Sequence, residues 1–225
     1  MPSQPPIVIA IDGPAGAGKS TVAKQLAKVL KISYLDTGAM YRALTLKGLQ
    51  EKINFENENS VVDLAKRTNI ELEDSGSQLK VLLDGKDVSD AIRSVEVTNS
   101  TFYVARAPKV REIMVQWQRR MAQKKGIVAE GRDIGTVVFP HATKKFYLDA
   151  NVEERSRRRI EELKAKGKLV DAQKLTQELQ ERDQKDFTRS VGPLKQAEDA
   201  VYMDTTFWSV DENVSQILKY IQKYG

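Results

Sequence analysis

The sequence contains no cysteine and only one histidine, His141. Without thiols, disulfide bonds and thiolate metal sites are excluded, and we expect a cytoplasmic location, where proteins are kept reduced. A single histidine argues against a histidine-based metal centre and against a Ser-His hydrolase. Because His141 follows Phe139 and Pro140 in what reads as a loop, we interpret it as structural.

Long hydrophobic runs are also absent. No apolar stretch approaches the roughly 20 residues that a membrane-spanning helix needs. Residues 1–6 have neither the basic nor the apolar region of a signal peptide, and we expect them to form a short flexible tail. We therefore expect no membrane partner. No internal repeat or low-complexity linker divides the chain of 225 residues, which is long enough for one domain with an excursion.

The charge balance is positive, with 36 Lys and Arg against 31 Asp and Glu, a net charge of +5. Such a balance suits nucleic acid, but it equally suits a protein that binds two phosphorylated small molecules. The sequence has no interleaved aromatic and basic residues of the kind that stack bases. We therefore favour small-molecule partners and expect no nucleic-acid partner. An NTP-dependent nucleic-acid-binding protein stays as the alternative from another class.

The most informative motif is residues 13–20, Gly-Pro-Ala-Gly-Ala-Gly-Lys-Ser, which fits the phosphate-binding loop G-x-x-x-x-G-K-[ST]. An apolar run at 7–11 precedes it and predicts a buried strand, and Val22, Leu26 and Leu30 follow it at helical spacing. A strand, a glycine loop and a helix in this order point backbone N–H groups at a polyphosphate. The sequence therefore predicts binding of a nucleoside triphosphate.

Within this loop, Lys19 is expected to reach the β- and γ-phosphates and the Ser20 hydroxyl to ligate Mg²⁺. The residues expected to contact the triphosphate are consecutive in the chain: Gly13, Pro14, Ala15, Gly16, Ala17, Gly18, Lys19, Ser20 and Thr21.

Strand and helix patterns alternate along the rest of the chain. Further short apolar strands are predicted at 32–35, 127–129, 146–148 and 201–203, and helices at 39–50, 110–121 and 210–221. This alternation predicts an α/β fold, with a parallel five-stranded sheet and helices on both of its faces.

One segment, from Asn54 to Asn99, breaks that alternation. It combines a short helical pattern with strands at 70–72 and 79–83, which are separated by a turn at 74–77. Asp84-Gly85 predicts a second tight turn. We interpret the segment as a small α+β insert that recognises a substrate.

The remaining motifs distinguish among the P-loop classes. The D-x-x-G and N-K-x-D signatures of Ras-like GTPases are absent from the sequence. Motor and ABC-type ATPases are usually longer and have a strand that ends in an acidic residue. Here Glu130 stands at the end of a predicted strand and could act on magnesium. The nearby Arg132 and Asp133, however, are interpreted as ligand contacts. Arg42 and Arg132 lie next to glycine turns at strand ends, where parallel sheets bind ligands.

Further arginines follow helical spacings. Arg182, Asp186 and Arg189 are expected to share one helical face, and Arg155, Arg158 and Arg159 to cluster on the helix after the fourth strand. A guanidinium can donate to two phosphate oxygens at once, so two bound nucleotides would need several arginines. For the 155–159 cluster, solvated surface arginines are an equally good interpretation.

Taken together, residues 12–21, 35–42 and 131–140, with Glu181-Arg182-Asp183, Asp186 and Arg189, resemble bacterial-type cytidylate kinases. The resemblance runs from about residue 7 to 220, with the motifs in family order. It implies a P-loop NTPase fold in one domain over 1–225, with an NMP-binding excursion at about 37–105 that carries an extra three-stranded element. It also implies a short mobile lid at about 155–171 and a monomer.

The resemblance implies phosphoryl transfer from Mg·ATP to CMP or dCMP, giving ADP and the diphosphate. Carried over residue by residue, it implies a base contact at Thr37, cytosine-reading residues at Arg111 and Asp133, and sugar contacts at Arg182 and Asp186. The phosphate-gripping arginines fall on Arg42, Arg132 and Arg189, and lid arginines on Arg155, Arg158 and Arg159. Glu130 departs from the family, in which an aspartate often precedes Gly-Arg-Asp.

Two alternatives stay open. One is a monophosphate kinase with another base preference, such as UMP or AMP. The second concerns Asp133, which could cap the turn after the third core strand instead of reading the base. As a carboxylate Asp133 only accepts hydrogen bonds, and Arg111 only donates, which complements the 4-amino group and N3 of cytosine but not uracil.

Overall fold

The computed structural model describes residues 6–74, 79–123, 125–165, 167 and 169–223. Its strands are β1 (Val8–Asp12), β2 (Ser33–Asp36), β3 (Ile70–Asp74), β4 (Leu79–Leu83), β5 (Lys86–Asp87), β6 (Ile127–Gly131), β7 (Lys144–Asp149) and β8 (Val201–Asp204). Its α-helices are α1 (Lys19–Leu30), α2 (Thr37–Gln50), α3 (Glu58–Lys66), α4 (Val95–Ala105), α5 (Pro108–Met121), α6 (Val152–Ala165), α7 (Ala172–Thr188) and α8 (Val210–Lys223). Two shorter helices are the 3₁₀-helix η1 (Ala91–Arg93) and the π-helix η2 (Ile134–Val138). In the part of the chain that is described, no helix is long and apolar enough to cross a membrane.

The predicted five-stranded sheet is confirmed, with the strand order β2-β6-β1-β7-β8. Strand β1 pairs in parallel with β7, placing Asp12 opposite Tyr147, and β7 pairs in parallel with β8, placing Asp149 opposite Asp204. The carboxyl ends of these strands therefore meet at one edge, where parallel sheets bind ligands.

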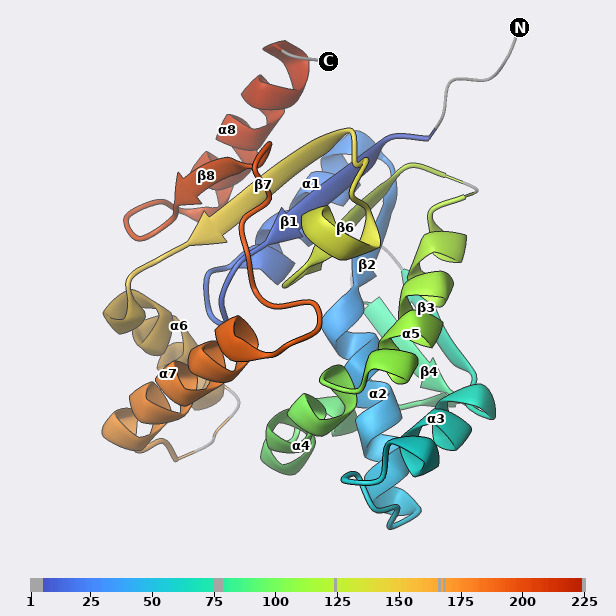
Figure 1. The fold of residues 1–225 in the computed structure, drawn as a ribbon. Helices are drawn as coiled ribbons and strands as arrows, with labels where there is room; N and C mark the ends of the chain where they lie inside the picture. Colours follow the sequence, from blue (N-terminus) through green and yellow to red (C-terminus); the bar gives the residue numbers. More distant parts are fainter. Residues whose placement is uncertain (1–5, 75–78, 124, 166, 168, 224–225) are drawn as a thin grey trace, which may run out of the picture. The chain divides into compact units, whose positions relative to one another are not determined.

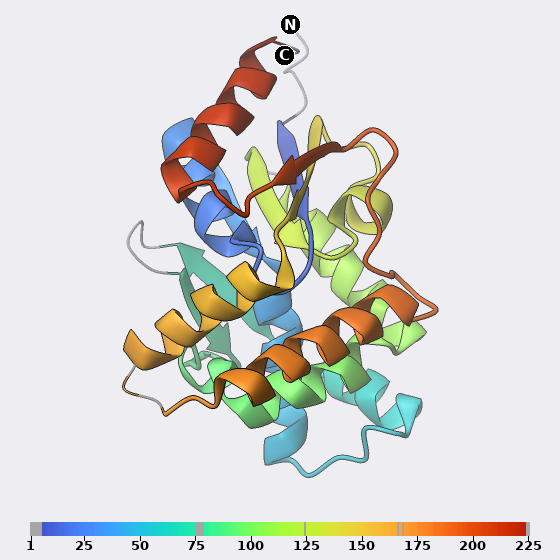
Figure 2. The ribbon, with the colours of Figure 1, turned by 90° about the vertical axis from the view of Figure 1, so that its left-hand side faces the viewer.

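The chain divides into two compact units, each described by itself. The second unit comprises Ile7–Ile32 and Val128–Gly225. In it α1 and α8 pack against each other on one side of the strands, and η2 lies against β1 on the other (Figures 1 and 2). Its core contains the fully buried side chains of Ile9, Ile11 and Leu26.

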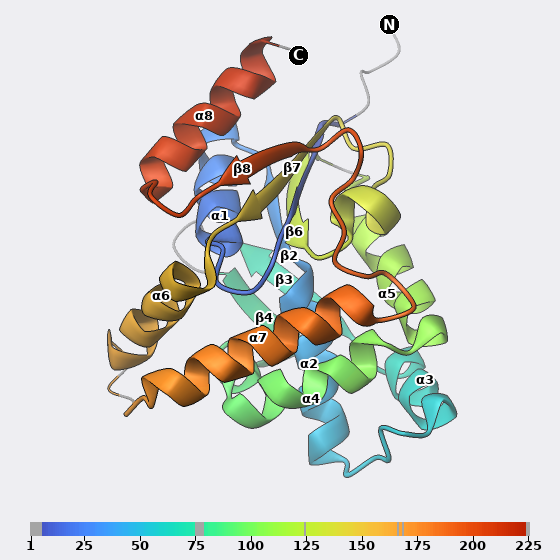
Figure 3. The same ribbon diagram turned by 60° about the vertical axis from the view of Figure 1, so that its left-hand side comes forward.

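Helices α6 and α7 also belong to this unit and pack against each other (Figure 3). The segment expected to form the lid, about 155–171, begins within α6 and ends just before α7. Residues 166 and 168 of the expected lid lie outside the described residues, as do residues 1–5 of the expected tail.

The first unit, Met1–Pro6 and Ser33–Ile127, contains the predicted insert. Its three-stranded sheet has the order β3-β4-β5, with β3 and β4 antiparallel and Ile70 opposite Leu83. The predicted turn at Asp84-Gly85 is confirmed: both residues have positive φ, 49° and 80°, as a type I′ hairpin requires. Residues 75–77 of the predicted turn at 74–77, between β3 and β4, lie outside the described residues.

The structure differs from the local expectations in three places. Helix α2 begins at Thr37, two residues before the predicted start, because Asp36 caps it by accepting a hydrogen bond from the N–H of Ala39 at 2.7 Å. Helix α4 was not predicted, because its β-branched and aromatic residues favour strands; Ser94 caps it and it packs on α2. Arg189 does not share the helical face of Arg182 and Asp186, because α7 ends at Thr188 and Arg189 is extended, with φ −62° and ψ 140°.

Candidate active site

The glycine-rich loop joins β1 to α1 and has the backbone conformation that its glycines permit. Gly13 has φ 147°, and a Cβ there would lie 1.9 Å from the carbonyl oxygen of Leu148 in β7. Gly16 has φ 81°, and a Cβ there would lie 2.9 Å from the Cβ of Arg155. The first turn of α1 begins after Gly18, which has no side chain to cap it. Its N–H groups are therefore available to an anion.

Lys19 opens α1 and is buried, with 5% of its surface exposed. Its Nζ donates a hydrogen bond to the carbonyl oxygen of Pro14 at 2.6 Å. Burial, together with the weaker effect of the positive charges of Arg132 and Arg182, lowers the pKa of Lys19 to about 7, against the opposing effect of Glu130. An anion placed against Lys19 would therefore be strongly favoured, because it would offset the cost of the buried charge.

Three side chains from other elements hold the backbone of the loop. The N–H of Ala15 donates to Asp183 of α7 at 3.4 Å, and its carbonyl accepts from Nη1 of Arg155 at 3.0 Å. The hydroxyl of Thr205, just after β8, donates to the carbonyl of Ala17 at 3.2 Å. None of these three contacts follows from the P-loop motif itself.

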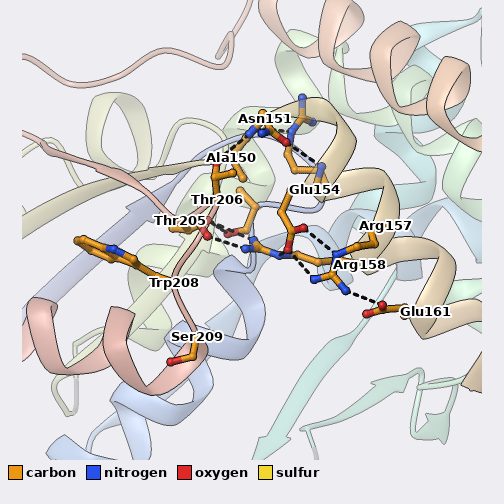
Figure 4. Close-up of polar contacts among 12 residues, drawn as sticks. Ala150, Asn151, Glu154, Arg157, Arg158, Glu161, Thr205, Thr206, Trp208 and Ser209 are labelled. Carbon is orange, nitrogen blue, oxygen red and sulfur yellow. Dashed lines mark hydrogen bonds and ion pairs between the residues drawn. The ribbon is translucent and has the colours of Figure 1, made fainter.

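Two arginines expected to belong to the lid bind carbonyl groups and carboxylates near the glycine loop. Arg155 is buried, forms an ion pair with Asp183, and donates from Nε to the carbonyl of Ala150 at 2.9 Å. Arg158 donates from Nη2 to the carbonyl of Thr205 at 2.5 Å and from Nε to Glu154 at 2.8 Å (Figure 4). These contacts indicate a structural role for both; their expected part in phosphoryl transfer stays a prediction.

Glu154 forms ion pairs with two arginines of α6. It accepts hydrogen bonds from both Arg157 and Arg158, which lower its pKa to about 2, Arg157 having the larger effect (Figure 4). Arg159 instead pairs with Glu162 at 2.5 Å. The arginine-rich face of α6 is thus largely neutralised by its own carboxylates.

The arginines around the end of β6 form a different cluster. Nε of Arg132 lies 2.7 Å from Asp186, whose other oxygen lies 3.8 Å from Arg189. Arg189 also lies 3.7 Å from Asp133, and only 5% of its side chain is exposed. Burial opposes charge on Arg132 and Asp186, but their mutual attraction prevails: the pKa of Arg132 is raised and that of Asp186 lowered. The structure thus brings these four residues together, and their roles in binding a substrate stay predictions.

The first unit carries the other expected contacts. Thr37 is buried at the start of α2, and Arg42, one turn further, lies 3.0 Å from Asp36. Arg111 is buried near the start of α5, with its guanidinium 5.7 Å from the ring centre of Tyr41 and Nη1 donating to the carbonyl of Ala105 at 3.4 Å. These residues are therefore ordered within their own unit.

Comparison with known proteins identifies the family of this chain. The sequence profile described as Cytidylate kinase matches residues 9–223. The chain belongs to the cytidylate kinase family. It is 53% identical over 215 residues to a cytidylate kinase of Desulforamulus reducens and 51% identical over 217 residues to one of Anoxybacillus flavithermus, with 96% of each chain covered in both cases.

A solved structure with a similar fold is that of an uncharacterized protein from Eubacterium ventriosum. Its TM-score is 0.53 at 14% identity, with 96% of this chain and 98% of that chain covered. At this identity the likeness extends to the fold alone.

Three residues of the site escaped the sequence reasoning: Asp12, Asp183 and Thr205. Asp12 and Asp183 were visible only as letters within family motifs, beside the glycine loop and beside Arg182. Thr205 carried no signal. Asp12 is 3% exposed, and its carboxylate accepts hydrogen bonds from the backbone of Ile134 and Gly135 in η2.

The side chain of Asp133 does not cap η2, which removes the capping interpretation of Asp133.

Metal binding can be judged from the donor set. Within residues 6–74, 79–123, 125–165, 167 and 169–223, no group of three or more His, Cys, Asp or Glu side chains could hold a metal ion. Ser20 is exposed at the first turn of α1. Mg²⁺ is commonly held by one or two protein oxygens together with substrate phosphates, so a single hydroxyl beside the glycine loop fits this ion.

Proposed function

We propose that the protein transfers the γ-phosphoryl group of ATP to CMP or dCMP, giving ADP and CDP or dCDP. Membership of the cytidylate kinase family over residues 9–223 supports this reaction. One observation in the site carries the proposal: Lys19 of the glycine loop lies close enough to Arg132 and Arg182 that their charges lower its pKa. Positive charge concentrated in this way, with Lys19 buried and both arginines partly buried, fits two phosphate-bearing substrates.

The donor end would be the glycine loop. Backbone N–H groups within residues 13–21, other than Pro14, which has none, would bind the β- and γ-phosphates of ATP. Lys19 would leave the carbonyl of Pro14 to contact them. The Ser20 hydroxyl would hold Mg²⁺. When bound with ATP, this ion supplies positive charge between the β- and γ-phosphate oxygens.

The acceptor phosphate would be gripped by Arg132 and Arg189, which Asp186 holds 2.7 and 3.8 Å away. Guanidinium groups fixed in this way are already oriented before the substrate arrives, which lowers the entropy lost on binding. By resemblance, Arg42 would assist at the phosphate, and Arg182 and Asp186 would contact the sugar.

The base would be read by Thr37, Arg111 and Asp133. A carboxylate can accept a hydrogen bond from the 4-amino group of cytosine, and a guanidinium can donate to its N3 or O2. Uracil presents a carbonyl and an N–H at the corresponding positions, so it would leave polar groups unpaired. Each unpaired buried group costs about 1–3 kcal/mol, so CMP should be preferred over UMP by roughly tenfold to a few hundredfold in kcat/KM.

No general base is needed in this mechanism. The acceptor is a phosphate whose second pKa is about 6, so its nucleophilic oxygen is already ionised near neutral pH. The protein contributes position and positive charge, which is what phosphoryl transfer requires. We further propose that closure of the insert and the lid excludes water, which would otherwise accept the phosphoryl group.

The protein would work as a monomer in the cytoplasm, where ATP and nucleoside monophosphates are available, with no membrane or nucleic-acid partner. The deciding experiment offers CMP, dCMP, UMP, AMP, GMP and a polynucleotide separately with Mg·ATP and measures ADP formation. CMP and dCMP should be the best acceptors. A preference for UMP or AMP would identify a monophosphate kinase of another specificity, and stimulation by the polynucleotide alone would contradict the proposal.

A further inference from the structure

Asp12 is the last residue of β1, and the glycine loop begins directly after it. Both oxygens of its buried carboxylate are used: Oδ1 accepts from the N–H of Ile134 at 2.7 Å and Oδ2 from the N–H of Gly135 at 2.8 Å. Burial raises the pKa of Asp12 to about 7, although the two backbone donors oppose this shift. The carboxylate thus lies in an environment where these two hydrogen bonds are its main stabilisation.

These two N–H groups belong to the first residues of η2, the five-residue π-helix after β6. The first N–H groups of any helix lack partners within the helix, and an acidic side chain commonly provides one. The side chain of Asp133, directly before η2, makes no capping hydrogen bond. Asp12 at the end of β1 provides the cap instead, 122 positions before Ile134 in the sequence. The conformation of this turn therefore depends on Asp12.

The turn matters because Arg132 and Asp133 come directly before it. Arg132 contacts Asp186 at 2.7 Å and Asp133 lies 3.7 Å from Arg189, so both side chains belong to the proposed acceptor cluster. A shift of η2 would move the backbone that carries them.

The glycine loop, in contrast, has anchors of its own. Asp183 and Arg155 hold Ala15, Thr205 holds Ala17, and the backbone of Gly13 packs directly on Leu148. The two hydrogen bonds of the Asp12 carboxylate go to η2, whereas Lys19 of the loop acts on it only through a weaker interaction between charges. Loss of the carboxylate should therefore disturb the acceptor end and leave the donor end in place.

We propose that Asp12 is a positioning residue for the acceptor nucleotide: it fixes the turn Ile134–Val138 so that Arg132 and Asp133 are held in place to bind the monophosphate. This rests on the proposed CMP kinase activity, whose acceptor residues these are. A purely structural role would lower stability without distinguishing the two nucleotides.

The test compares Asp12→Asn with the wild-type protein. The amide is similar in size but accepts only one of the two N–H groups and presents its own NH₂ to the other. We expect the KM and Kd for CMP to rise by about tenfold or more, because one buried donor loses its partner. The Kd for ADP should stay within about threefold of wild type.

Two further variants sharpen the comparison. Gly135→Ala approaches the same contact from the other side, since its Cβ would lie 3.4 Å from Oδ2 of Asp12 and 3.1 Å from the side chain of Lys145. It should weaken CMP binding in the same direction but less. Asp183→Asn should give the opposite pattern, with ADP affinity reduced more than CMP affinity.

Asp211→Asn is the matched control, because Asp211 is an exposed carboxylate that accepts a hydrogen bond from Gln25 at 2.6 Å. It should leave both affinities unchanged. Calorimetry measures CMP and ADP binding without turnover, and ADP formation gives KM and kcat.

Equal losses of CMP and ADP affinity in Asp12→Asn, or unchanged affinities with lower stability, would overturn the inference. If Asp12→Asn does not fold, an unchanged CMP affinity in Gly135→Ala would overturn it. If the wild-type protein binds ADP but does not phosphorylate CMP, the proposed function fails instead, which is a separate result.

Discussion

Replacing Arg155 with alanine should destabilise the protein more than replacing any exposed arginine of the same helix, α6, with alanine. Both Arg155 and Asp183 are buried, with 9% and 10% of their side chains exposed, and they form an ion pair. Arg155→Ala would leave the Asp183 carboxylate without that partner. It would also remove the donors to the carbonyls of Ala15 and Ala150.

The magnitude follows from that burial. Removing one partner of a buried ion pair costs about 3–5 kcal/mol, mostly because the remaining charge stays buried. Each of the two lost hydrogen bonds to the carbonyl groups adds roughly 1 kcal/mol, and the contributions are not additive. We therefore expect the free energy of unfolding to fall by about 3–5 kcal/mol, a large share of the roughly 5–15 kcal/mol typical of a domain.

Urea unfolding followed by circular dichroism measures this change. The matched control is Arg157→Ala on the same helix, because Arg157 is 57% exposed and pairs only with Glu154 and Glu161. Its unfolding midpoint should match wild type. The double variant Arg155→Met with Asp183→Leu should recover much of the lost stability, since it removes both charges together.

Arg155→Ala and Arg157→Ala with the same midpoint would refute this reasoning. If Arg155→Ala also lost most of its turnover while remaining as stable as wild type, Arg155 would act on the transferred phosphoryl group, as the resemblance to the family implies.

Three further predictions concern the nucleotides. Binding of ADP should take up protons and weaken as the pH rises above about 7, because the pKa of Lys19 is lowered in the free protein and a bound polyphosphate would raise it. Calorimetry in buffers of different ionisation enthalpy measures this proton uptake. Lys19→Met should abolish both the proton uptake and phosphoryl transfer. Asp133→Asn should narrow the ratio of kcat/KM for CMP over UMP, because an amide can donate to O4 of uracil; an unchanged ratio would show that the base is read elsewhere. Hydrogen exchange should show the insert of residues 54–99 protected by CMP more than by an ATP analogue, because its unit carries Thr37, Arg42 and Arg111; equal protection by either ligand alone would contradict this.

Much of the fold could be read from local sequence patterns. The strands of the parallel sheet appear as short apolar runs, and the turn at Asp84-Gly85 follows from residues that tolerate positive φ. Helix α4 could not be read in this way, because its β-branched residues are held helical by packing on α2 and by the Ser94 cap. The position of Arg189 beyond the end of α7 likewise depends on contacts outside the helix, with Asp133 and Gly192.

The sequence by itself determined the glycine loop, the order of strands and helices and the family, because each depends on residues that are neighbours in the chain. Through the resemblance to the family it also implied phosphate-binding roles for Arg42, Arg132 and Arg189, which stay predictions. Only the tertiary structure decided what Arg155 and Asp12 contact. Arg155 pairs with Asp183, 28 positions away, and Asp12 caps a turn 122 positions away. No local periodicity records such pairings, because the first arises only when α6 packs on α7 and the second only when the fold brings η2 against β1.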